Sequence, residues 1–154
     1  MSYEHAQEIV PRLWLGNKHA AIDDDFLRRQ KINVVFNCTK DYPFSPRVLR
    51  KYRVPVDDNL EPTEIKNMES WGPEIVYKVL AEHKRGENIL IHCHAGMQRS
   101  AAVMAMTLIA KTGQPADNVM KFIREKRPVA FFPVANFDTA IRGFEKTVNK
   151  ALDR

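Results

Sequence analysis

A cysteine and an arginine stand six positions apart, at Cys93 and Arg99, where the local pattern predicts a loop between a strand and a helix. Backbone N–H groups of such a loop, above the positive end of a helix, form a concavity that binds an oxyanion. A thiol among these donors and beside a guanidinium is stabilised in its negative form, so Cys93 should be substantially thiolate, the nucleophilic form. Arg99 offers a planar fork of donors to two phosphate oxygens. The pair therefore predicts a phosphate site with a nucleophile at its floor.

The segments on either side have the composition that such a site needs. Residues 88–92 form a short apolar run with β-branched members, which predicts a strand buried on both faces. Residues 100–110 are apolar on every side, which predicts a buried helix. The loop between them contains His94, Ala95, Gly96, Met97 and Gln98. The alternative is a core cysteine that happens to precede a turn.

A second candidate element is the acidic loop that contains Asp57 and Asp58 and follows a short strand expected over residues 51–56. A phosphoester needs a proton on its leaving oxygen and then a base for the attacking water. A loop carboxylate able to approach the phosphate site serves both purposes. The residues alone leave both aspartates open for this role.

Residues 92–100 read His-Cys-x5-Arg-Ser with Ala-Gly inside, and this run resembles the signature of cysteine-based protein tyrosine phosphatases. It most resembles the small, atypical dual-specificity branch, whose opening strand is also similar to residues 9–16. The resemblance implies one catalytic domain over residues 1–154 and phosphate binding by residues 94–99.

The resemblance also implies roles for single residues. Asp58 falls three positions after a strand proline, where relatives carry the general acid, so it is favoured over its neighbour. Ser100 matches a hydroxyl that hydrogen-bonds the departing thiolate. His92 is expected to orient the loop, Asn37 to brace it by hydrogen bonds, and Asn136 to lie close to it. For the two asparagines, a purely structural role as a cap or loop brace is the alternative.

Cys38 follows a predicted strand over residues 32–37. If the strands are parallel, it lies at the same end of the sheet as Cys93. Some relatives protect an oxidised nucleophile by pairing it with a second cysteine in this region. A buried structural thiol is the alternative.

The implied reaction has two steps. Cys93 attacks phosphorus while Asp58 protonates the leaving oxygen, and water activated by Asp58 then hydrolyses the cysteinyl-phosphate. Arg99 and the loop N–H groups stabilise both transition states. The expected substrates are phosphotyrosine, phosphoserine and phosphothreonine in proteins. A phosphoinositide or RNA 5′-phosphate substrate is an alternative, as is a module that binds phosphorylated partners without turnover.

Composition limits the remaining possibilities. With 154 residues, 44% hydrophobic and 28% charged, the chain fits one globular domain and excludes wholesale disorder. No apolar run is long enough to span a bilayer, and the polar first residues predict no signal peptide. Two cysteines make no disulfide scaffold, and a catalytic thiol implies a reducing compartment. We therefore expect an intracellular protein, cytoplasmic and also compatible with the nucleus.

Charge and histidine spacing bear on partners and cofactors. The net charge of +5 favours anionic substrates, but the basic residues are dispersed, so nucleic acid is not expected as a partner. The resemblance implies phosphorylated proteins as partners. The scattered histidines His5, His19 and His83 lack ligand spacing, so neither a metal nor a cofactor is expected. The sequence leaves the oligomeric state open.

Alternating strand and helix signals predict a three-layer α/β fold with a central, mainly parallel sheet of four or five strands. The expected strands cover residues 9–16, 32–37, 51–56 and 88–92, and the expected helices cover residues 20–30, 71–83, 100–110, 115–126 and 136–152. Helices on both faces of the sheet complete this architecture.

Overall fold

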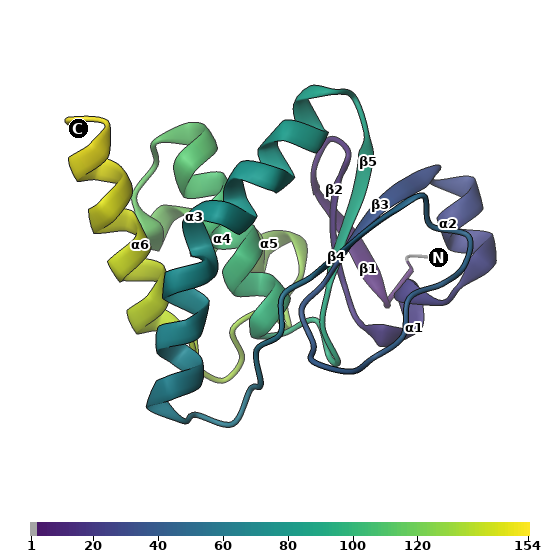
Figure 1. Ribbon diagram of the computed structural model, residues 1–154, viewed down its shortest axis with the longest axis horizontal. Helices are drawn as coiled ribbons and strands as arrows, with labels where there is room; N and C mark the ends of the chain where they lie inside the picture. The colour runs from purple at the N-terminus through teal and green to yellow at the C-terminus, as the bar shows by residue number, and fades with distance from the viewer. Residues whose placement is uncertain (1–2) are drawn as a thin grey trace.

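A five-stranded sheet lies between two groups of helices in the computed structural model of the chain (Figure 1). The structure describes residues 3–154. Residues 1 and 2, which belong to the polar start that predicts no signal peptide, lie outside the described residues. The strands are β1 (Ala6–Val10), β2 (Leu13–Gly16), β3 (Ile32–Asn37), β4 (Arg50–Arg53) and β5 (Asn88–His92).

The strand order is β1-β2-β5-β3-β4. The pairs β2–β5, β5–β3 and β3–β4 run parallel, while β1 and β2 form an antiparallel pair. Because parallel strands end at the same edge, the register brings Gly16, Asn37 and His92 side by side. The prediction of a mainly parallel sheet is confirmed, and β5 lies at its centre.

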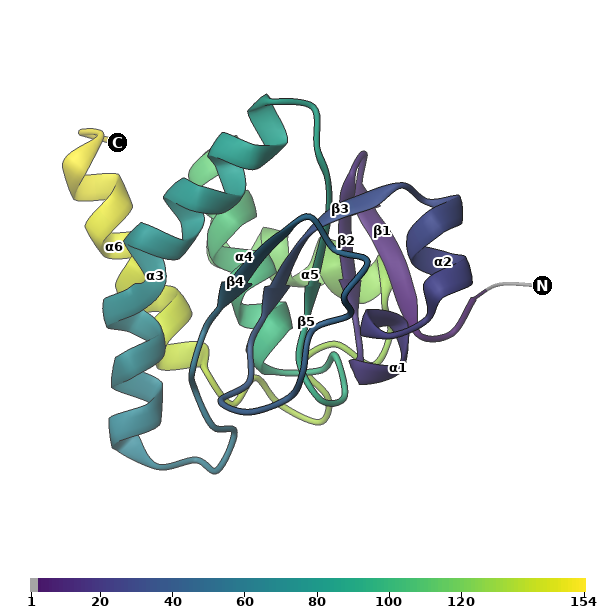
Figure 2. The same cartoon turned by 45° about the vertical axis from the view of Figure 1, so that its right-hand side comes forward.

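The helices form the two outer layers. They are α1 (Lys18–Ala21), α2 (Asp24–Arg29), α3 (Pro62–Lys84), α4 (Arg99–Thr112), α5 (Ala116–Lys126) and α6 (Asp138–Ala151). Figure 1 shows α1 and α2 on one side of the sheet and α3 to α6 on the other, and the turned view of Figure 2 agrees. Helices on both faces were expected, and this is confirmed. None of the helices within residues 3–154 has the length and hydrophobicity that a bilayer crossing requires.

The strand β5 and the helix α4 both lie in the core. Ile89 and Ile91 pack in one hydrophobic cluster with α4, whereas Leu90 faces the cluster formed with α1 and α2, and all three are fully buried. Residues 101–106 of α4 are also fully buried. Burying each large aliphatic side chain contributes about 1.5–3 kcal/mol. The predictions of a strand buried on both faces and a helix buried all round are confirmed, and both ends of the phosphate loop are rigidly held.

Two expected elements near the N-terminus are each divided. Residues 9–16 are not one strand, because β1 and β2 form a hairpin whose turn contains Arg12 at φ 70°. The helix expected over residues 20–30 is two short helices. Asn17 caps α1 by accepting from two backbone N–H groups, and Asp23 caps α2 by accepting from Phe26 N. An aspartate that satisfies a helix start favours a new N-terminus over an uninterrupted helix.

Three other element boundaries, two of them at the acidic loop, differ from those expected. α3 begins at Pro62 and not near residue 71, since a proline at the first helical position needs no N–H partner. The strand expected over residues 51–56 is β4, which ends at Arg53. α6 begins at Asp138, two residues after the expected start. The shorter strand and the earlier helix fix both ends of the loop that carries Asp57 and Asp58.

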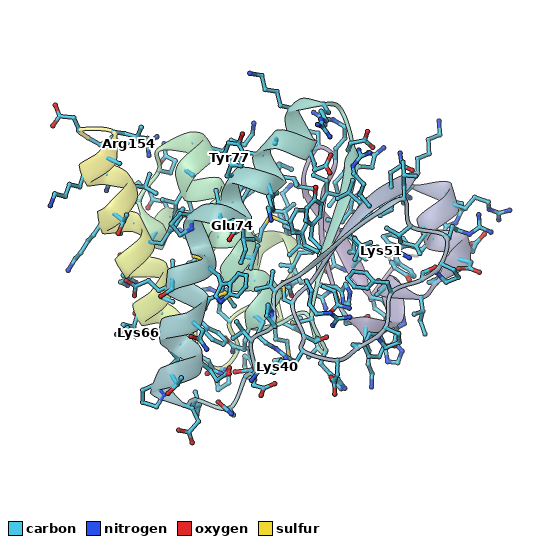
Figure 3. The ribbon with its side chains drawn as sticks, viewed as in Figure 1. Lys40, Lys51, Lys66, Glu74, Tyr77 and Arg154 are labelled. Carbon is cyan, nitrogen blue, oxygen red and sulfur yellow. The ribbon has the colours of Figure 1, made fainter. Side chains whose placement is uncertain are left out.

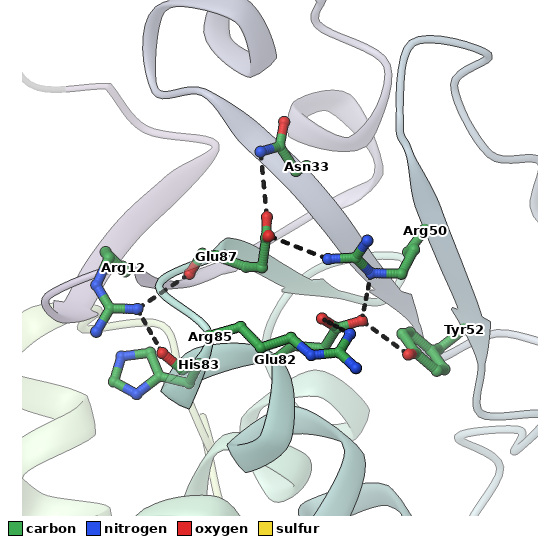
Figure 4. Close-up of polar contacts among 8 residues, drawn as sticks. All are labelled: Arg12, Asn33, Arg50, Tyr52, Glu82, His83, Arg85 and Glu87. Carbon is green, nitrogen blue, oxygen red and sulfur yellow. Dashed lines mark hydrogen bonds and ion pairs between the residues drawn. The ribbon is translucent and has the colours of Figure 1, made fainter.

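The amino-terminal edge of the sheet is held by a polar network (Figure 4). Buried Glu82 accepts from Arg50 Nε at 2.7 Å and from the Tyr52 hydroxyl at 2.8 Å, and Arg50 also pairs with Glu87 at 3.1 Å. Arg12 Nη1 donates to the carbonyl of His83 at 2.6 Å. This network joins the end of α3 to β4 and to the residues directly before β2 and β5, and it lies at the edge opposite Cys93.

Candidate active site

A cavity of about 330 Å³ opens where β5 ends and α4 begins. Its lining residues are Asp58, Cys93, His94, Ala95, Met97, Gln98, Arg99, Phe132 and Asn136. All of them except Phe132 are residues that the sequence predicts for the site. The cavity therefore unites three segments that are far apart in the chain, which are the loop of Asp58, the loop of residues 93–99 and the segment before α6.

The carbonyl groups of residues 93–98 all accept hydrogen bonds from the surrounding structure. Taken in the order of the carbonyls from residue 93 to residue 98, the donors are His92 Nδ1, Lys18 N, Arg127 Nη2, Arg127 Nε, Phe131 N and Ala102 N. The bonds are between 2.7 and 3.2 Å long. Six consecutive carbonyls are thus held in fixed directions by six donors from outside the loop.

Fixing the carbonyls also fixes the N–H groups. In a trans peptide the N–H points opposite to the preceding C=O, so the N–H groups of residues 94–99 point away from these donors. Within residues 3–154, none of the six N–H groups has a hydrogen bond to a protein acceptor. Together with the N-terminus of α4, they form an oxyanion site of the predicted kind.

Gly96 makes this curvature possible. Its φ of +68° lies in the left-handed region, and a Cβ there would stand 2.5 Å from the carbonyl oxygen of Gly16 and 2.8 Å from Arg127 Nη2. Any side chain at this position would push the loop away from β2. The glycine is therefore required by backbone conformation and by close approach.

Cys93 and Ser100 are in direct contact at the floor of the cavity. Their Sγ and Oγ atoms are 3.0 Å apart, and both residues are buried. A hydroxyl at this distance can donate to a thiolate. Ser100 thus combines its position in the first turn of α4 with a hydrogen bond to the nucleophile.

Arg99 is anchored on one side only. Its Nη1 donates to the carbonyl of Val56 at 3.0 Å, whereas its Nε is buried and has no partner among residues 3–154. A buried guanidinium N–H without a protein acceptor is costly. An oxyanion in the cavity that Arg99 lines would satisfy this donor and accept a two-pronged hydrogen bond.

Asp57 and Asp58 point in different directions. Asp57 pairs with Lys40 at 3.1 Å, and the same ammonium pairs with Glu64 at 3.1 Å, near the lower edge of the view in Figure 3 where Lys40 is labelled. Asp58 instead lines the cavity, where its Oδ1 accepts from Asn136 Nδ2 at 2.9 Å. The geometry therefore favours Asp58 as the carboxylate that faces a bound phosphoester.

Comparison with known proteins agrees with this arrangement. The family model described as dual specificity phosphatase, catalytic domain, matches residues 13–147. The chain belongs to this family. The family match covers most of the chain, including Asp58, Cys93, Arg99 and Asn136.

Individual relatives of this dual specificity phosphatase domain are distant. Human dual specificity protein phosphatase 4 is 28% identical over 142 residues, which cover 92% of this chain and 35% of that protein. For human dual specificity protein phosphatase 8, the identity is 23%, with 91% and 22% covered. The chain thus spans about a third or less of the length of these curated relatives.

Solved structures also resemble the domain. A mouse putative dual specificity phosphatase, complexed with zinc tungstate, superposes with a TM-score of 0.84 at 26% identity, covering 98% of this chain and 92% of that one. Human DUSP28 has a TM-score of 0.83 at 23% identity, with 97% of each chain covered. The second likeness supports the fold alone.

His92 is fully buried behind the phosphate loop. Its Nδ1 lies 3.2 Å from the Cys93 carbonyl, and because a carbonyl only accepts, this nitrogen carries the proton. Burial lowers the pKa of His92 to about 4. His92 is therefore a buried neutral residue that donates to the first carbonyl of the loop, and its expected role in orienting that loop stays a prediction.

His94 lies at the exposed rim. Its Nε2 is 3.0 Å from Lys18 Nζ, and its pKa is lowered by partial burial and by the nearby charges of Lys18 and Arg99. A neutral imidazole that accepts from the ammonium fits these surroundings. The rim therefore carries a lysine that the sequence did not indicate.

Asn37 does not bond to the phosphate loop in the expected way. Its side chain accepts from Thr39 N and the Thr39 hydroxyl and donates to the carbonyl of Tyr42. The contact with the loop strand is made instead by the next residue, because Cys38 N donates to His92 O at 2.8 Å. The amide of Asn37 shapes the turn after β3, which is the structural alternative for this residue.

Cys38 is fully buried, and both cysteines are free thiols. Burial raises the pKa of Cys38 well above its ordinary value, and the nearby Cys93 adds to this shift. A protonated buried thiol reacts slowly, which is typical of a structural cysteine. The pairing of Cys38 with an oxidised Cys93 stays a hypothesis.

The segment over residues 129–135 does more than pack against the body. Ala130 and Phe131 are buried, but Phe132 is 63% exposed and forms one wall of the cavity. The side chain of Gln98, a residue expected in the phosphate loop, donates to the carbonyls of Phe132 and Val134 and accepts from Asn136 N. The Gln98 side chain thus holds the loop, and only its backbone faces the phosphate site.

Proposed function

We propose that the chain is a phosphatase that hydrolyses phosphotyrosine, phosphoserine and phosphothreonine in proteins through a cysteinyl-phosphate intermediate. The observation that carries the proposal is the set of six unpaired N–H groups, within residues 3–154, around a cavity that contains Cys93, Arg99 and Asp58. Six donors and a guanidinium suit a tetrahedral dianion far better than any neutral ligand.

In the first step, the Cys93 thiolate attacks phosphorus from the floor of the cavity, opposite the leaving oxygen. The S–P bond forms while the P–O bond to the substrate breaks. Asp58, at the mouth of the cavity, delivers its proton to that oxygen. The loop N–H groups and Arg99 stabilise the charge on the three equatorial oxygens.

In the second step, Asp58 accepts a proton from water as the water attacks phosphorus, and the S–P bond breaks. Inorganic phosphate leaves and Cys93 returns as a thiolate. Ser100, 3.0 Å from the sulfur, donates a hydrogen bond that stabilises this departing thiolate. The cycle consumes one water and needs no electron transfer.

The breadth of the substrate class is supported by the surroundings of the cavity. Asp58, His94 and Phe132 are all exposed at its rim, so the walls are open and do not enclose an aryl ring. Within the loop, His94 and Met97 stand where phosphoinositide-specific relatives carry lysines. These features support protein phosphomonoesters over phosphoinositides and RNA 5′-phosphates.

The same chemistry supports an intracellular location. Cys38 and Cys93 are both free thiols, and a thiolate nucleophile persists in a reducing compartment. We infer that the partners are phosphorylated proteins of the cytoplasm or nucleus.

Turnover of para-nitrophenyl phosphate by purified protein tests the proposal. We expect Cys93→Ser to lower the rate more than about 1,000-fold, because no other nucleophile replaces the thiolate. A parallel panel of phosphotyrosine, phosphothreonine and phosphoserine peptides, phosphoinositides and 5′-phosphorylated RNA measures the substrate class.

Three results would contradict the proposal. Phosphopeptide binding without turnover in the unmutated protein would favour a binding module. Turnover that survives Cys93→Ser would remove the proposed nucleophile. A preference for a lipid or RNA phosphate over every phosphopeptide would replace the substrate class.

A further inference from the structure

Arg127, directly after α5, is the most deeply buried arginine of the described residues, with 3% of its surface exposed. Its guanidinium donates four hydrogen bonds. The acceptors are Gly96 O at 2.8 Å, Ala95 O at 3.1 Å, Gln7 Oε1 at 2.6 Å and Glu4 O at 3.2 Å. Two of the acceptors are consecutive carbonyls of the phosphate loop, and two belong to the N-terminal segment.

The two loop contacts determine the direction of two peptide groups. Nη2 holds the Ala95 carbonyl and Nε holds the Gly96 carbonyl, so the N–H groups of Gly96 and Met97 point toward the cavity. The guanidinium is planar, which means that one rigid group fixes both peptides together. The N-terminal contacts in turn fix the guanidinium.

The charge of Arg127 is not neutralised by its partners. None of the four acceptors is a carboxylate, so a positive charge lies buried directly beneath the loop. Burial lowers the pKa of Arg127, and the nearby Cys93 opposes this shift. A buried cation that hydrogen-bonds only neutral groups is expensive unless an anion lies close to it.

We propose that Arg127 is a positioning residue of the phosphate loop, which turns the N–H groups of Gly96 and Met97 toward a bound oxyanion and adds uncompensated positive charge behind them. It touches neither substrate nor nucleophile, and it acts through the backbone of the loop. The inference rests on the proposed function in taking residues 93–99 as the oxyanion site.

The test is the affinity for inorganic tungstate, a tetrahedral dianion that binds without being hydrolysed, measured by titration calorimetry. Arg127→Met keeps the aliphatic stem and removes the donors and the charge. We expect it to weaken tungstate binding about 10- to 100-fold, as for loss of hydrogen bonds that support a charged ligand. Arg127→Lys keeps the charge and one donor position, so it should weaken tungstate binding less than Arg127→Met does.

The matched control is Arg124→Met, which removes an exposed arginine three residues earlier, beside the ring of Phe131. It should leave tungstate affinity unchanged. Thermal unfolding of each variant identifies a temperature at which the variant is folded. At that temperature, amide NMR spectra report how far the Gly96 and Met97 N–H signals shift when tungstate is added. In the unmutated protein both signals should move, and in Arg127→Met the movement should be much smaller.

Each outcome separates this inference from the proposed function. Unchanged tungstate affinity in folded Arg127→Met or Arg127→Lys would overturn the inference and leave the phosphatase proposal intact. Tungstate binding by unmutated protein that hydrolyses no phosphoester would overturn the phosphatase proposal alone. No tungstate binding by the unmutated protein would overturn this inference, and turnover of para-nitrophenyl phosphate would still decide the phosphatase proposal separately.

Discussion

Asn136 Nδ2 donates a hydrogen bond to Asp58 Oδ1 over 2.9 Å and joins two loops that are 78 residues apart in the chain. Both side chains line the cavity that contains Cys93. The amide engages one carboxyl oxygen, Oδ1, and leaves Oδ2 free of this hydrogen bond. Asn136 therefore sets the orientation of the proposed general acid.

Replacing Asn136 by alanine should impair proton delivery selectively. We expect kcat for a phosphoserine peptide to fall about tenfold, a part of the 10²–10⁴-fold that general acid catalysis contributes. Para-nitrophenyl phosphate should be affected less, because its leaving oxygen hardly needs a proton. Steady-state kinetics on both substrates checks this, with exposed Asn118→Ala as control. Equal losses on both substrates would contradict an orienting role.

Replacement by asparagine should have very different effects on kcat at the two neighbouring aspartates. Asp58→Asn removes the proton donor and should lower kcat for phosphopeptides about 10²- to 10⁴-fold. Asp57→Asn removes only a half-exposed ion pair with Lys40 outside the cavity and should leave kcat nearly unchanged. The reverse pattern would exchange the roles of the two residues.

The buried His92 should make the protein less stable in acid. Its pKa is about 4 when folded against 6.5 in the unfolded chain, so between these pH values the unfolded state binds more protons. Above pH 6.5, His92 does not reduce the free energy of unfolding. As pH falls toward 4, the free energy of unfolding decreases by roughly 3 kcal/mol. Urea unfolding from pH 7 to pH 4 should show a smaller decrease for His92→Gln than for exposed His19→Gln. Parallel decreases would mean that His92 is not held neutral.

The polar network at the opposite edge should contribute to stability and not to catalysis. Glu82→Gln replaces a buried carboxylate that accepts from Arg50 and Tyr52 by a neutral amide, while Arg50 keeps its pair with Glu87, so the free energy of unfolding should fall by about 1–2 kcal/mol. Glu74→Gln, on the outward side of α3 in Figure 3, loses only an exposed pair with Lys78 and should cost about 0.5 kcal/mol or less. Chemical denaturation measures both, and kcat should change in neither. A large kcat effect of Glu82→Gln would couple the two edges.

The local sequence pattern is sufficient to predict the structure at the centre of the molecule. The apolar run of β5, the all-round apolar surface of α4 and the Cys93 to Arg99 spacing are properties of one continuous segment, so the sequence predicts strand, loop and helix together. The resemblance favoured Asp58 over Asp57, and the geometry agrees because Lys40 holds Asp57. Boundaries near Asp23 and Pro62 were missed because capping competed with hydrophobic periodicity.

The remainder of the site depends on contacts between distant segments. Arg127 reads in the sequence only as the end of a helix before a proline, yet its side chain reaches carbonyls 31 and 32 positions away. Gln98 similarly bonds to residues 34 to 38 positions ahead. An arginine next to a helix end is usually exposed, and nothing in its neighbours signals that this one is buried.

The covalent intermediate provides the most direct test of Cys93 as nucleophile. Ser100→Ala removes the hydroxyl 3.0 Å from the sulfur, so the second step should slow more than the first and phosphoenzyme should accumulate. Thr107→Val, which removes another buried hydroxyl of α4, is the control and should show no accumulation. After rapid quenching of a reaction with a phosphotyrosine peptide, mass spectrometry should locate phosphate on Cys93. Continued turnover with no phosphate on Cys93 in any quenched sample would contradict the account.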